Sequence, residues 1–416
     1  MAIRGLEQII LDQAEVFGSR DPGTTREVDF ERYMTNQQIV VISGIRRCGK
    51  STLLRQFAAR CDRYYYVNFD DERLINFTVD NFSELMLCFR KQFESNTIFI
   101  DEVQNVDYWE RFVRRVQDEG YKIYLTGSNA RLLSSELGTH LTGRYSKVEL
   151  YPFSFSEFLA FYKVTYDTLT SATEAKVLTY FDNYLTMGAF PEYLNYQDKE
   201  FLARTYEDIL HRDIISRKQI RDVKSFQQLC HYLFSNFTRD LSYNALAKTL
   251  GINSPMTVKN YIQALQESYL VYELFKYDFS LKKQITHSKK IYVVDNGMRN
   301  TVAFAFSEDR GNLLENLVYM SLRRQGENLY VYKGTRECDF LIERQGRVVE
   351  AIQVCYDLSD TNLDREVEGL TQAMGKLNCP KGRLLTYNQQ TADWADSGTL
   401  LPGIEIQPVW RWLLSV

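Results

Sequence analysis

The sequence predicts an α/β protein whose first domain is a parallel sheet with helices on both faces. Three observations predict this class. β-rich runs alternate with helical patterns over about 120 residues from Ile39 onwards. A glycine-rich loop stands between the first strand and the helix that follows it. Hydrophobic residues at 44% and charged residues at 25% are globular averages, which exclude a disordered or fibrous chain.

The elements of this domain follow in order along the chain. Buried strands are predicted at 37–43, 64–69, 96–101 and 122–128, with helices starting at Ser51 and spanning 83–93 and 109–116. Trp109, Phe112, Val113 and Val116 repeat at helical spacing and predict a core-facing side. From Phe155 to about Phe237 the strand signal disappears and helical spacing takes over, so a mainly helical segment follows.

A phosphate-binding motif fills the loop after the first strand. The pattern G-x-x-x-x-G-K-[ST] is met by Gly44, Ile45, Arg46, Arg47, Cys48, Gly49, Lys50 and Ser51. Backbone N–H groups would converge on phosphate oxygens, Lys50 would bind the β and γ phosphates, and the Ser51 hydroxyl would ligate magnesium, with Thr52 as the alternative. Arg46 and Arg47 are either further phosphate contacts or solvated charges. The motif predicts ATP and Mg²⁺ as cofactors.

Two adjacent carboxylates end the third predicted strand. Asp101 would hold the magnesium through water, and Glu102 would polarise the attacking water. Ordinary turn residues are the alternative interpretation of this pair. After the next strand comes Ser128, whose side chain would reach the γ-phosphate or the attacking water, and Arg144 stands alone before another β-rich stretch.

These motifs resemble a known family. IFIDE at 98–102, LTGS at 125–128, LTGR at 141–144 followed by YPFSFSEFL, and MGAFPEYL at 187–194 are similar to bacterial and archaeal AAA-superfamily ATPases with a C-terminal domain of unknown function. The resemblance implies Ser128 as a sensor and Arg144 as an arginine finger, acting in cis or in trans. It also implies an ATPase core at 1–155, a helical lid at 156–237, a winged helix at 238–285 and a nuclease-like, inactive α/β domain at 286–416.

A helix-turn-helix pattern supports the winged helix. The run 241–252 ends in Gly251, and Ser254-Pro255 opens a second helix. Residues 239–290 carry eight Lys/Arg against four Asp/Glu. In a DNA-binding interpretation the second helix presents Met256, Thr257, Lys259, Asn260 and Gln263 outward, while Lys282, Lys283, Lys289 and Lys290 meet phosphates. The alternative is a winged helix that only packs domains together.

The last third resembles the restriction-endonuclease fold, with Glu315 on its first helix and Asp339 on its second strand. Such a site needs carboxylates for a divalent metal and an E-x-K step. The positions of that step hold Gln353 and Cys355, and if Glu350 were the acid the lysine position would be Ile352. Glu350 also lies on the opposite strand face from Gln353. A degenerate nuclease site is therefore predicted, with Lys333 as the nearest substitute lysine in sequence.

Two functions fit the sequence. The first is a Mg²⁺-dependent ATPase whose nucleotide state moves the C-terminal segments on double-stranded DNA or an unidentified protein partner. The second is a switch or scaffold with slow ATP turnover and no DNA binding. The expected partners are ATP, ADP and further copies of the chain. No run of 18 apolar residues occurs, Glu7, Asp12 and Glu15 interrupt the N-terminal run, and the seven cysteines form no CxxC pair. A cytoplasmic protein without membrane contact is predicted.

Overall fold

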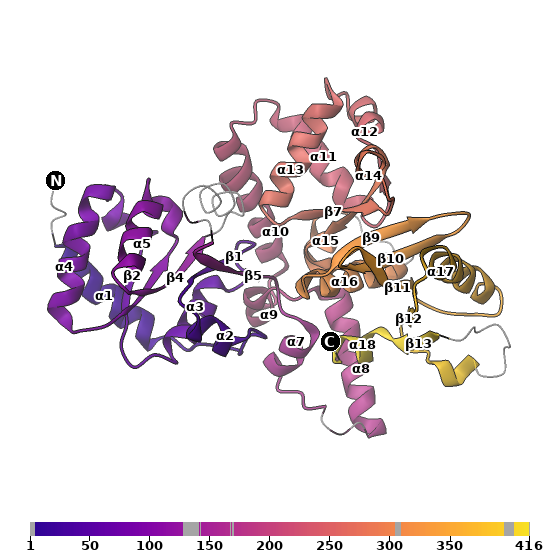
Figure 1. Ribbon diagram of the computed structural model, residues 1–416, viewed down its shortest axis with the longest axis horizontal. Coiled ribbons are helices and arrows are strands. Elements are labelled where there is room, and N and C mark those ends of the chain that lie inside the picture. Colours follow the sequence, from indigo (N-terminus) through magenta and orange to yellow (C-terminus); the bar gives the residue numbers. More distant parts are fainter. Residues whose placement is uncertain are drawn as a thin grey trace. The chain divides into compact units, whose positions relative to one another are not determined.

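A computed structural model describes residues 5–127, 141, 143–166, 168, 170–303, 309–394 and 403–415. The chain divides into two compact units, Met1–Pro152 and Phe153–Val416. In Figure 1 the first unit runs from indigo to purple, and the second from magenta to yellow. All seven cysteines are free. None of the described helices combines the length and the apolar character that crossing a membrane requires.

The first unit is built on a five-stranded sheet in the order β2-β3-β4-β1-β5, in which every neighbouring pair is parallel. The predicted parallel sheet is therefore confirmed. Because the strands are parallel, the carboxyl ends of β1, β4 and β3 lie along one edge of the sheet, with β4 in the middle. The strands are β1 (Ile39–Gly44), β2 (Tyr65–Asn68), β3 (Thr97–Asp101), β4 (Lys122–Gly127) and β5 (Tyr145–Leu150).

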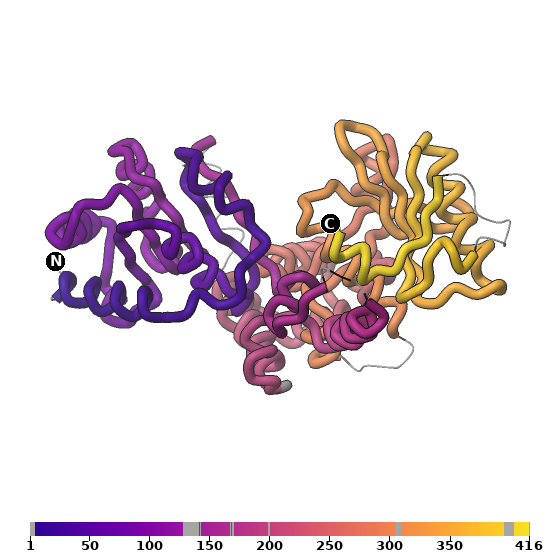
Figure 2. The backbone as a smooth tube through the Cα atoms, turned by 90° about the horizontal axis from the view of Figure 1, so that it is seen from below, coloured from indigo at the N-terminus to yellow at the C-terminus, as the bar shows by residue number. Residues whose placement is uncertain are grey.

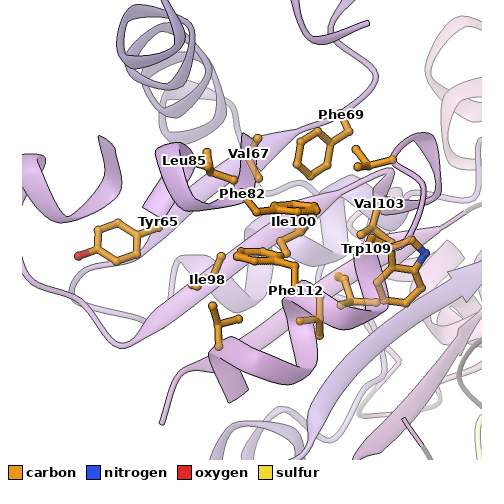
Figure 3. Close-up of a cluster of buried hydrophobic side chains, with 14 of the residues drawn as sticks. Tyr65, Val67, Phe69, Phe82, Leu85, Ile98, Ile100, Val103, Trp109 and Phe112 are labelled. Carbon is orange, nitrogen blue, oxygen red and sulfur yellow. The ribbon is translucent and has the colours of Figure 1, made fainter. Parts of the chain in front are cut away.

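Helices cover both faces of this sheet. On one face the Phe57 ring of α3 lies 5.0 Å from the Tyr124 ring of β4, measured between centroids. On the other face Phe82 of α4 stacks on Phe112 of α5 at 4.0 Å, as Figure 3 shows. The helices are α1 (Leu6–Ser19), α2 (Phe30–Thr35), α3 (Lys50–Ala58), α4 (Phe82–Gln92) and α5 (Trp109–Asp118), with short 3₁₀ turns η1 (Glu72–Leu74), η2 (Val79–Asn81) and η3 (Val103–Asn105).

The core-facing side predicted for the third helix is confirmed. All four of its predicted apolar side chains are buried in the cluster of Figure 3: Trp109, Phe112, Val113 and Val116. Each fully buried large apolar side chain stabilises the fold by about 1.5–3 kcal/mol. The four side chains of α5 therefore belong to the hydrophobic core of the first unit. No role in nucleotide binding is assigned to them.

The second unit opens with helices and continues as a mixed helix and strand segment. Its helices are α7 (Phe155–Phe161), α8 (Ser171–Met187), α9 (Pro191–Tyr196), α10 (Lys199–Asp208), the π-helix η5 (Ile209–Ser216), α11 (Val223–Ser235), α12 (Tyr243–Leu250), α13 (Pro255–Glu267), α14 (Leu281–Thr286), α15 (Asn296–Val302), α16 (Arg310–Arg324), α17 (Leu363–Leu377), η7 (Thr391–Trp394) and α18 (Val409–Leu413). Gly251 ends α12 in the left-handed conformation, and the Ser254 hydroxyl accepts from the Thr257 N–H at the start of α13. Both predicted caps are therefore present.

One eight-stranded sheet runs through this unit in the order β13-β12-β11-β10-β9-β7-β8-β6. The terminal strands, yellow in Figure 2, continue the sheet formed by the orange ones. The strands are β6 (Asp240–Leu241), β7 (Val271–Lys276), β8 (Lys289–Val293), β9 (Asn328–Lys333), β10 (Glu337–Arg344), β11 (Arg347–Cys355), β12 (Gly382–Thr386) and β13 (Ile404–Pro408). The segments predicted as lid, winged helix and nuclease-like domain thus lie in one unit, and the last two share a sheet.

A glycine turn after α8 is locked to the start of α15. Asp295 accepts from the Ala189 N–H at 2.8 Å and from the Met298 N–H at 2.9 Å. Gly188 has φ 74°, and a Cβ there would lie 2.1 Å from Asp295 Oδ1. Burial raises the pKa of the Asp295 carboxyl to about 6, against the effect of these backbone hydrogen bonds. The MGAF segment at 187–190 therefore contacts Asp295, which lies between strand β8 of the sheet and helix α15.

Candidate nucleotide site

The phosphate-binding loop connects β1 to α3 as predicted. Gly44 and Gly49 have φ of 150° and 96°, and Arg47 also has a positive φ of 67°. A Cβ at Gly44 would lie 2.1 Å from the Leu150 carbonyl oxygen, so only glycine fits beside β5. The buried Lys50 ammonium donates to the carbonyls of Gly44 and Ile45 at 3.1 Å each. A phosphate would offer this ammonium stronger, charged acceptors in place of the two carbonyls.

The other loop residues differ in exposure. Ile45 and Cys48 are buried, Arg46 is half-buried and Arg47 is exposed. Thr52 lies in the first turn of α3, where its hydroxyl accepts from Arg55 Nη2 at 3.1 Å. Because the Thr52 hydroxyl already accepts from Arg55, Ser51 remains the predicted magnesium ligand.

Asp101 is the centre of the polar contacts at the end of β3. Its carboxylate accepts from the Thr126 hydroxyl of β4, and Ser51 lines the same pocket as Asp101. Burial raises the pKa of the Asp101 carboxyl, and the charge of Glu102 adds to the rise, while Thr126, Ser51 and Lys50 oppose it. The two predicted magnesium ligands, Ser51 and Asp101, are therefore brought together by α3 and β3.

The donor set fits a magnesium ion. A hydroxyl and a carboxylate supply the hard oxygen ligands that Mg²⁺ prefers, and Mg²⁺ usually takes its remaining ligands from water and phosphates. Among the described residues no group of three or more His, Cys, Asp or Glu side chains is arranged to hold a metal by itself.

Glu102 turns away from the strand that precedes it. Its φ of 51° is left-handed, an uncommon conformation for a residue other than glycine. The Glu102 N–H donates to the Thr126 hydroxyl at 3.0 Å, and its carboxylate accepts from the Gln104 amide. Thr126 therefore holds both members of the acidic pair, donating to Asp101 and accepting from Glu102.

Two predicted site residues need separate mention. Ser128 lies outside the described residues. Arg144 lies just before β5, paired through its backbone with Ile39, and its guanidinium forms an ion pair with Asp118 of α5. Because β1 runs from Ile39 to Gly44, roughly 16 Å of strand separates Arg144 from the phosphate-binding loop of its own chain. This placement does not support the cis alternative for Arg144.

Three residues of the site were given no role from the sequence. Thr126 belongs to the LTGS motif at 125–128 and is the penultimate residue of β4, and its contacts show its role. Tyr66 of β2 is buried and lines the same pocket as Asp101. Arg26 is buried and donates to the Cys48 carbonyl at 2.8 Å and to the Tyr151 carbonyl at 2.6 Å. Arg26 therefore braces the phosphate-binding loop from a segment without any recognisable motif.

The residues predicted to face DNA divide into two groups. Lys259, Asn260, Lys282 and Lys283 are exposed. Lys289 and Lys290 are buried, so the prediction that they meet phosphates is wrong. Lys289 donates to the carbonyls of Ile285 and His287. The local count of basic residues could not show that β8 turns both lysines inward.

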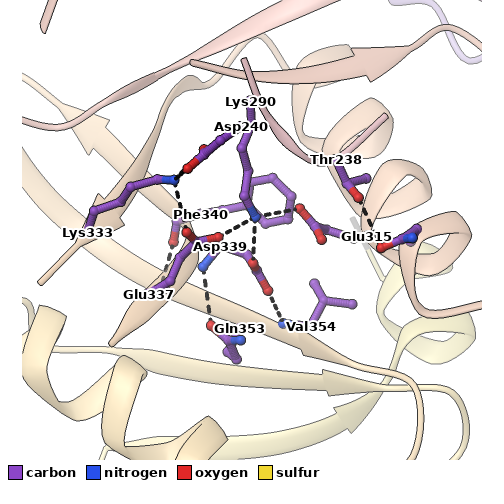
Figure 4. Close-up of polar contacts among 12 residues, drawn as sticks. Thr238, Asp240, Lys290, Glu315, Lys333, Glu337, Asp339, Phe340, Gln353 and Val354 are labelled. Carbon is purple, nitrogen blue, oxygen red and sulfur yellow. Dashed lines mark hydrogen bonds and ion pairs between the residues drawn. The ribbon is translucent and has the colours of Figure 1, made fainter. Parts of the chain in front are cut away.

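The predicted nuclease residues are only partly together. Glu315 and Asp339 both contact Lys290, and Gln353 accepts from the Asp339 N–H at 3.2 Å, as Figure 4 shows. Cys355 instead donates to the Asp357 carbonyl at 3.3 Å. Glu350 forms ion pairs with Arg383 at 2.9 Å and Lys381 at 3.2 Å. The lysine in this cluster is Lys290, which had been predicted to contact DNA phosphates.

Comparisons with known proteins agree with the nucleotide site. An AAA domain matches residues 36–159, and a domain of unknown function matches 178–309. An uncharacterized protein of Methanocaldococcus jannaschii is 35% identical over 98% of this chain and 95% of its own length. An uncharacterized Haemophilus influenzae protein is 28% identical over 90% and 94%. The Aeropyrum pernix ORC1 protein in complex with DNA aligns at 10% identity over 71% of this chain and 91% of that one, with a TM-score of 0.28, too low to support an argument.

Proposed function

The chain belongs to the family of the uncharacterized Methanocaldococcus jannaschii protein and carries an AAA domain, and we propose that it hydrolyses ATP. The observation that carries the proposal lies at the carboxyl edge of the sheet, where Asp101 accepts from Thr126 and shares a pocket with Ser51. Side chains from three different elements converge there on the position where a P-loop presents the γ-phosphate.

Each side chain then has a defined task. Loop N–H groups and Lys50 bind the phosphates, and Ser51 and Asp101 hold magnesium. The ion, when bound, neutralises charge on the phosphates. Glu102 accepts a proton from the attacking water, and Thr126 keeps the backbone of Glu102 and the carboxylate of Asp101 in register.

A chain of contacts supports coupling to the second unit. Arg26 joins the Cys48 carbonyl of the loop to the Tyr151 carbonyl. Phe153, which begins the second unit, donates its N–H to the Ala189 carbonyl at 2.9 Å. Ala189 in turn donates to Asp295. These contacts hold the chain in each unit on either side of the link between Pro152 and Phe153, and we propose that this link transmits nucleotide binding.

DNA is the partner we propose for the second unit, through exposed residues of α13 and α14. Lys259, Asn260, Lys282 and Lys283 are open to solvent, and no ion pair involving the three lysines is found among the described residues. Lysines that neutralise phosphates release counterions, so DNA affinity should fall steeply with salt. In the alternative function, a slow-turnover switch or scaffold, these lysines only face solvent.

Steady-state ATP turnover with and without duplex DNA separates the two functions. We expect sustained, DNA-stimulated turnover, and the Lys282→Ala/Lys283→Ala variant should flatten the log-log salt dependence of DNA affinity by about two units. Lys224→Ala/Lys248→Ala, two lysines of α11 and α12, is the matched control. Retained nucleotide with negligible turnover and no DNA binding at low salt would favour the scaffold.

Arg144 is proposed to act on the nucleotide of a neighbouring copy. Arg144 lies far from the phosphate-binding loop of its own chain, so a role in the site of a neighbouring copy is favoured. An arginine finger contributes a factor of about 10³ to 10⁵ to the rate of hydrolysis. We expect turnover per subunit to rise with protein concentration in the wild type and not in Arg144→Ala. A mixture of Arg144→Ala and Glu102→Gln chains should recover activity that neither has alone. No recovery in the mixture, with wild-type turnover independent of concentration, would reduce Arg144 to its ion pair with Asp118.

A further inference from the structure

A buried lysine occupies the centre of a carboxylate cluster in the second unit. Lys290 Nζ lies 3.0 Å from Glu315 Oε1, 2.5 Å from Glu337 Oε1 and 3.1 Å from Asp339 Oδ1. The Lys290 side chain is only 6% exposed. Figure 4 shows it reaching from β8 between the side chains of α16 and β10. The cluster therefore has a cation of its own.

The lysine and the carboxylates satisfy one another. The Lys290 ammonium donates to Glu315 Oε1 and Asp339 Oδ1 and forms an ion pair with Glu337. The Tyr292 hydroxyl also donates to Glu315 Oε1 at 2.7 Å, and the Val354 N–H donates to Asp339 Oδ2 at 3.0 Å. Glu315 Oε1 and both carboxylate oxygens of Asp339 are therefore already engaged by donors.

The remaining residues of the predicted nuclease site offer no replacement ligands. The oxygen of the Gln353 amide accepts from Asp339, and its nitrogen donates to Glu366 at 2.8 Å. Cys355 is bonded to a backbone carbonyl, as described above for the predicted site. The divalent metal that the restriction-endonuclease resemblance implies does not fit these residues.

We propose that Lys290 is the built-in cation of this cluster, taking the place of a divalent metal ion. A metal ion bound to Glu315 and Asp339 would have to share their oxygens with the ammonium, and two cations this close repel one another strongly away from water. This cluster is thereby closed to metal-dependent phosphodiester cleavage, and its carboxylates could bind a metal only if the lysine charge were removed. This inference does not depend on ATP hydrolysis.

The test is Mn²⁺ binding to nucleotide-free full-length protein, measured by calorimetry and by the melting temperature. Lys290→Met removes the charge and keeps the apolar stem, so the carboxylates lose their cation and should accept a metal. We expect Lys290→Met to bind Mn²⁺ at least about tenfold more tightly than the wild type and to melt at a higher temperature when Mn²⁺ is added. Adding Asp339→Asn to Lys290→Met should abolish both effects.

Lys333→Met is the matched control, because Lys333 contacts Glu337 and Asp240 but neither Glu315 nor Asp339 among the described contacts. It should bind Mn²⁺ as the wild type does. A folded Lys290→Met that gains no Mn²⁺ binding would overturn the proposal. If Lys290→Met does not fold, the wild type decides: equal Mn²⁺ binding in wild type and Asp339→Asn supports a closed cluster, and weaker binding in Asp339→Asn contradicts it.

Discussion

Glu102→Gln is expected to bind ATP with nearly wild-type affinity and to lose about 10²- to 10⁴-fold in turnover, the range that a general base contributes. The amide keeps the size of the side chain and its place after β3 but cannot take a proton from water. The backbone contact with Thr126 is unaffected by the change, so the acidic strand end should keep its shape. Binding of a fluorescent ATP analogue and phosphate release measure the two effects separately.

Lys50→Ala is the complementary variant. Lys50 interacts with phosphates already in the ground state, so its removal should weaken ATP binding at least about tenfold as well as turnover. Glu119→Gln, an exposed carboxylate that pairs with Arg90 and Arg115, serves as the surface control and should leave both unchanged. Equal losses of ATP affinity in Glu102→Gln and Lys50→Ala would contradict the assignment of these roles.

Gly188→Ala is expected to destabilise the second unit by at least about 3 kcal/mol. The added Cβ would overlap Asp295 Oδ1 at 2.1 Å, and the φ of 74° is unfavourable for alanine. Asp295 cannot move aside without releasing the N–H groups of Ala189 and Met298. Chemical denaturation followed by the fluorescence of Trp410 and Trp412, both buried in this unit, measures the loss.

Gly251→Ala separates the clash from the backbone strain. Gly251 has a similar φ of 66°, but nothing lies within 4 Å of the position of its Cβ. We expect a loss of only about 1 kcal/mol there. Equal losses in the two variants would mean that the contact between Gly188 and Asp295 contributes nothing beyond the backbone conformation.

The sequence predicted those features that depend on local pattern. The helix predicted at 109–116 is observed at Trp109–Asp118, and the parallel sheet follows from alternating strands and helices. The phosphate-binding loop was predicted because its chemistry requires glycines and a lysine in consecutive positions. Such features are specified within a dozen residues and can be recognised without knowing which distant segments meet.

Contacts between distant residues were not predictable in this way. Lys290 meets Glu315 and Asp339 across 25 and 49 positions, and a local charge count placed it on the surface. Arg26 reaches Tyr151 across 125 positions from a segment with no periodicity. Thr126 lies in the LTGS motif, but its hydrogen bonds with Asp101 and Glu102 join residues 25 and 24 positions apart. In each case the role depends on tertiary packing, which the sequence pattern does not contain.

The shared sheet of the second unit limits where the chain can be divided into fragments that fold. A fragment ending at residue 285 would keep β7 but lose both of its neighbours, β8 and β9. The backbone N–H and C=O groups of β7 would then form two bare edges, a common cause of aggregation. Fragments for expression should therefore be divided between Pro152 and Phe153, where the two compact units meet in the sequence.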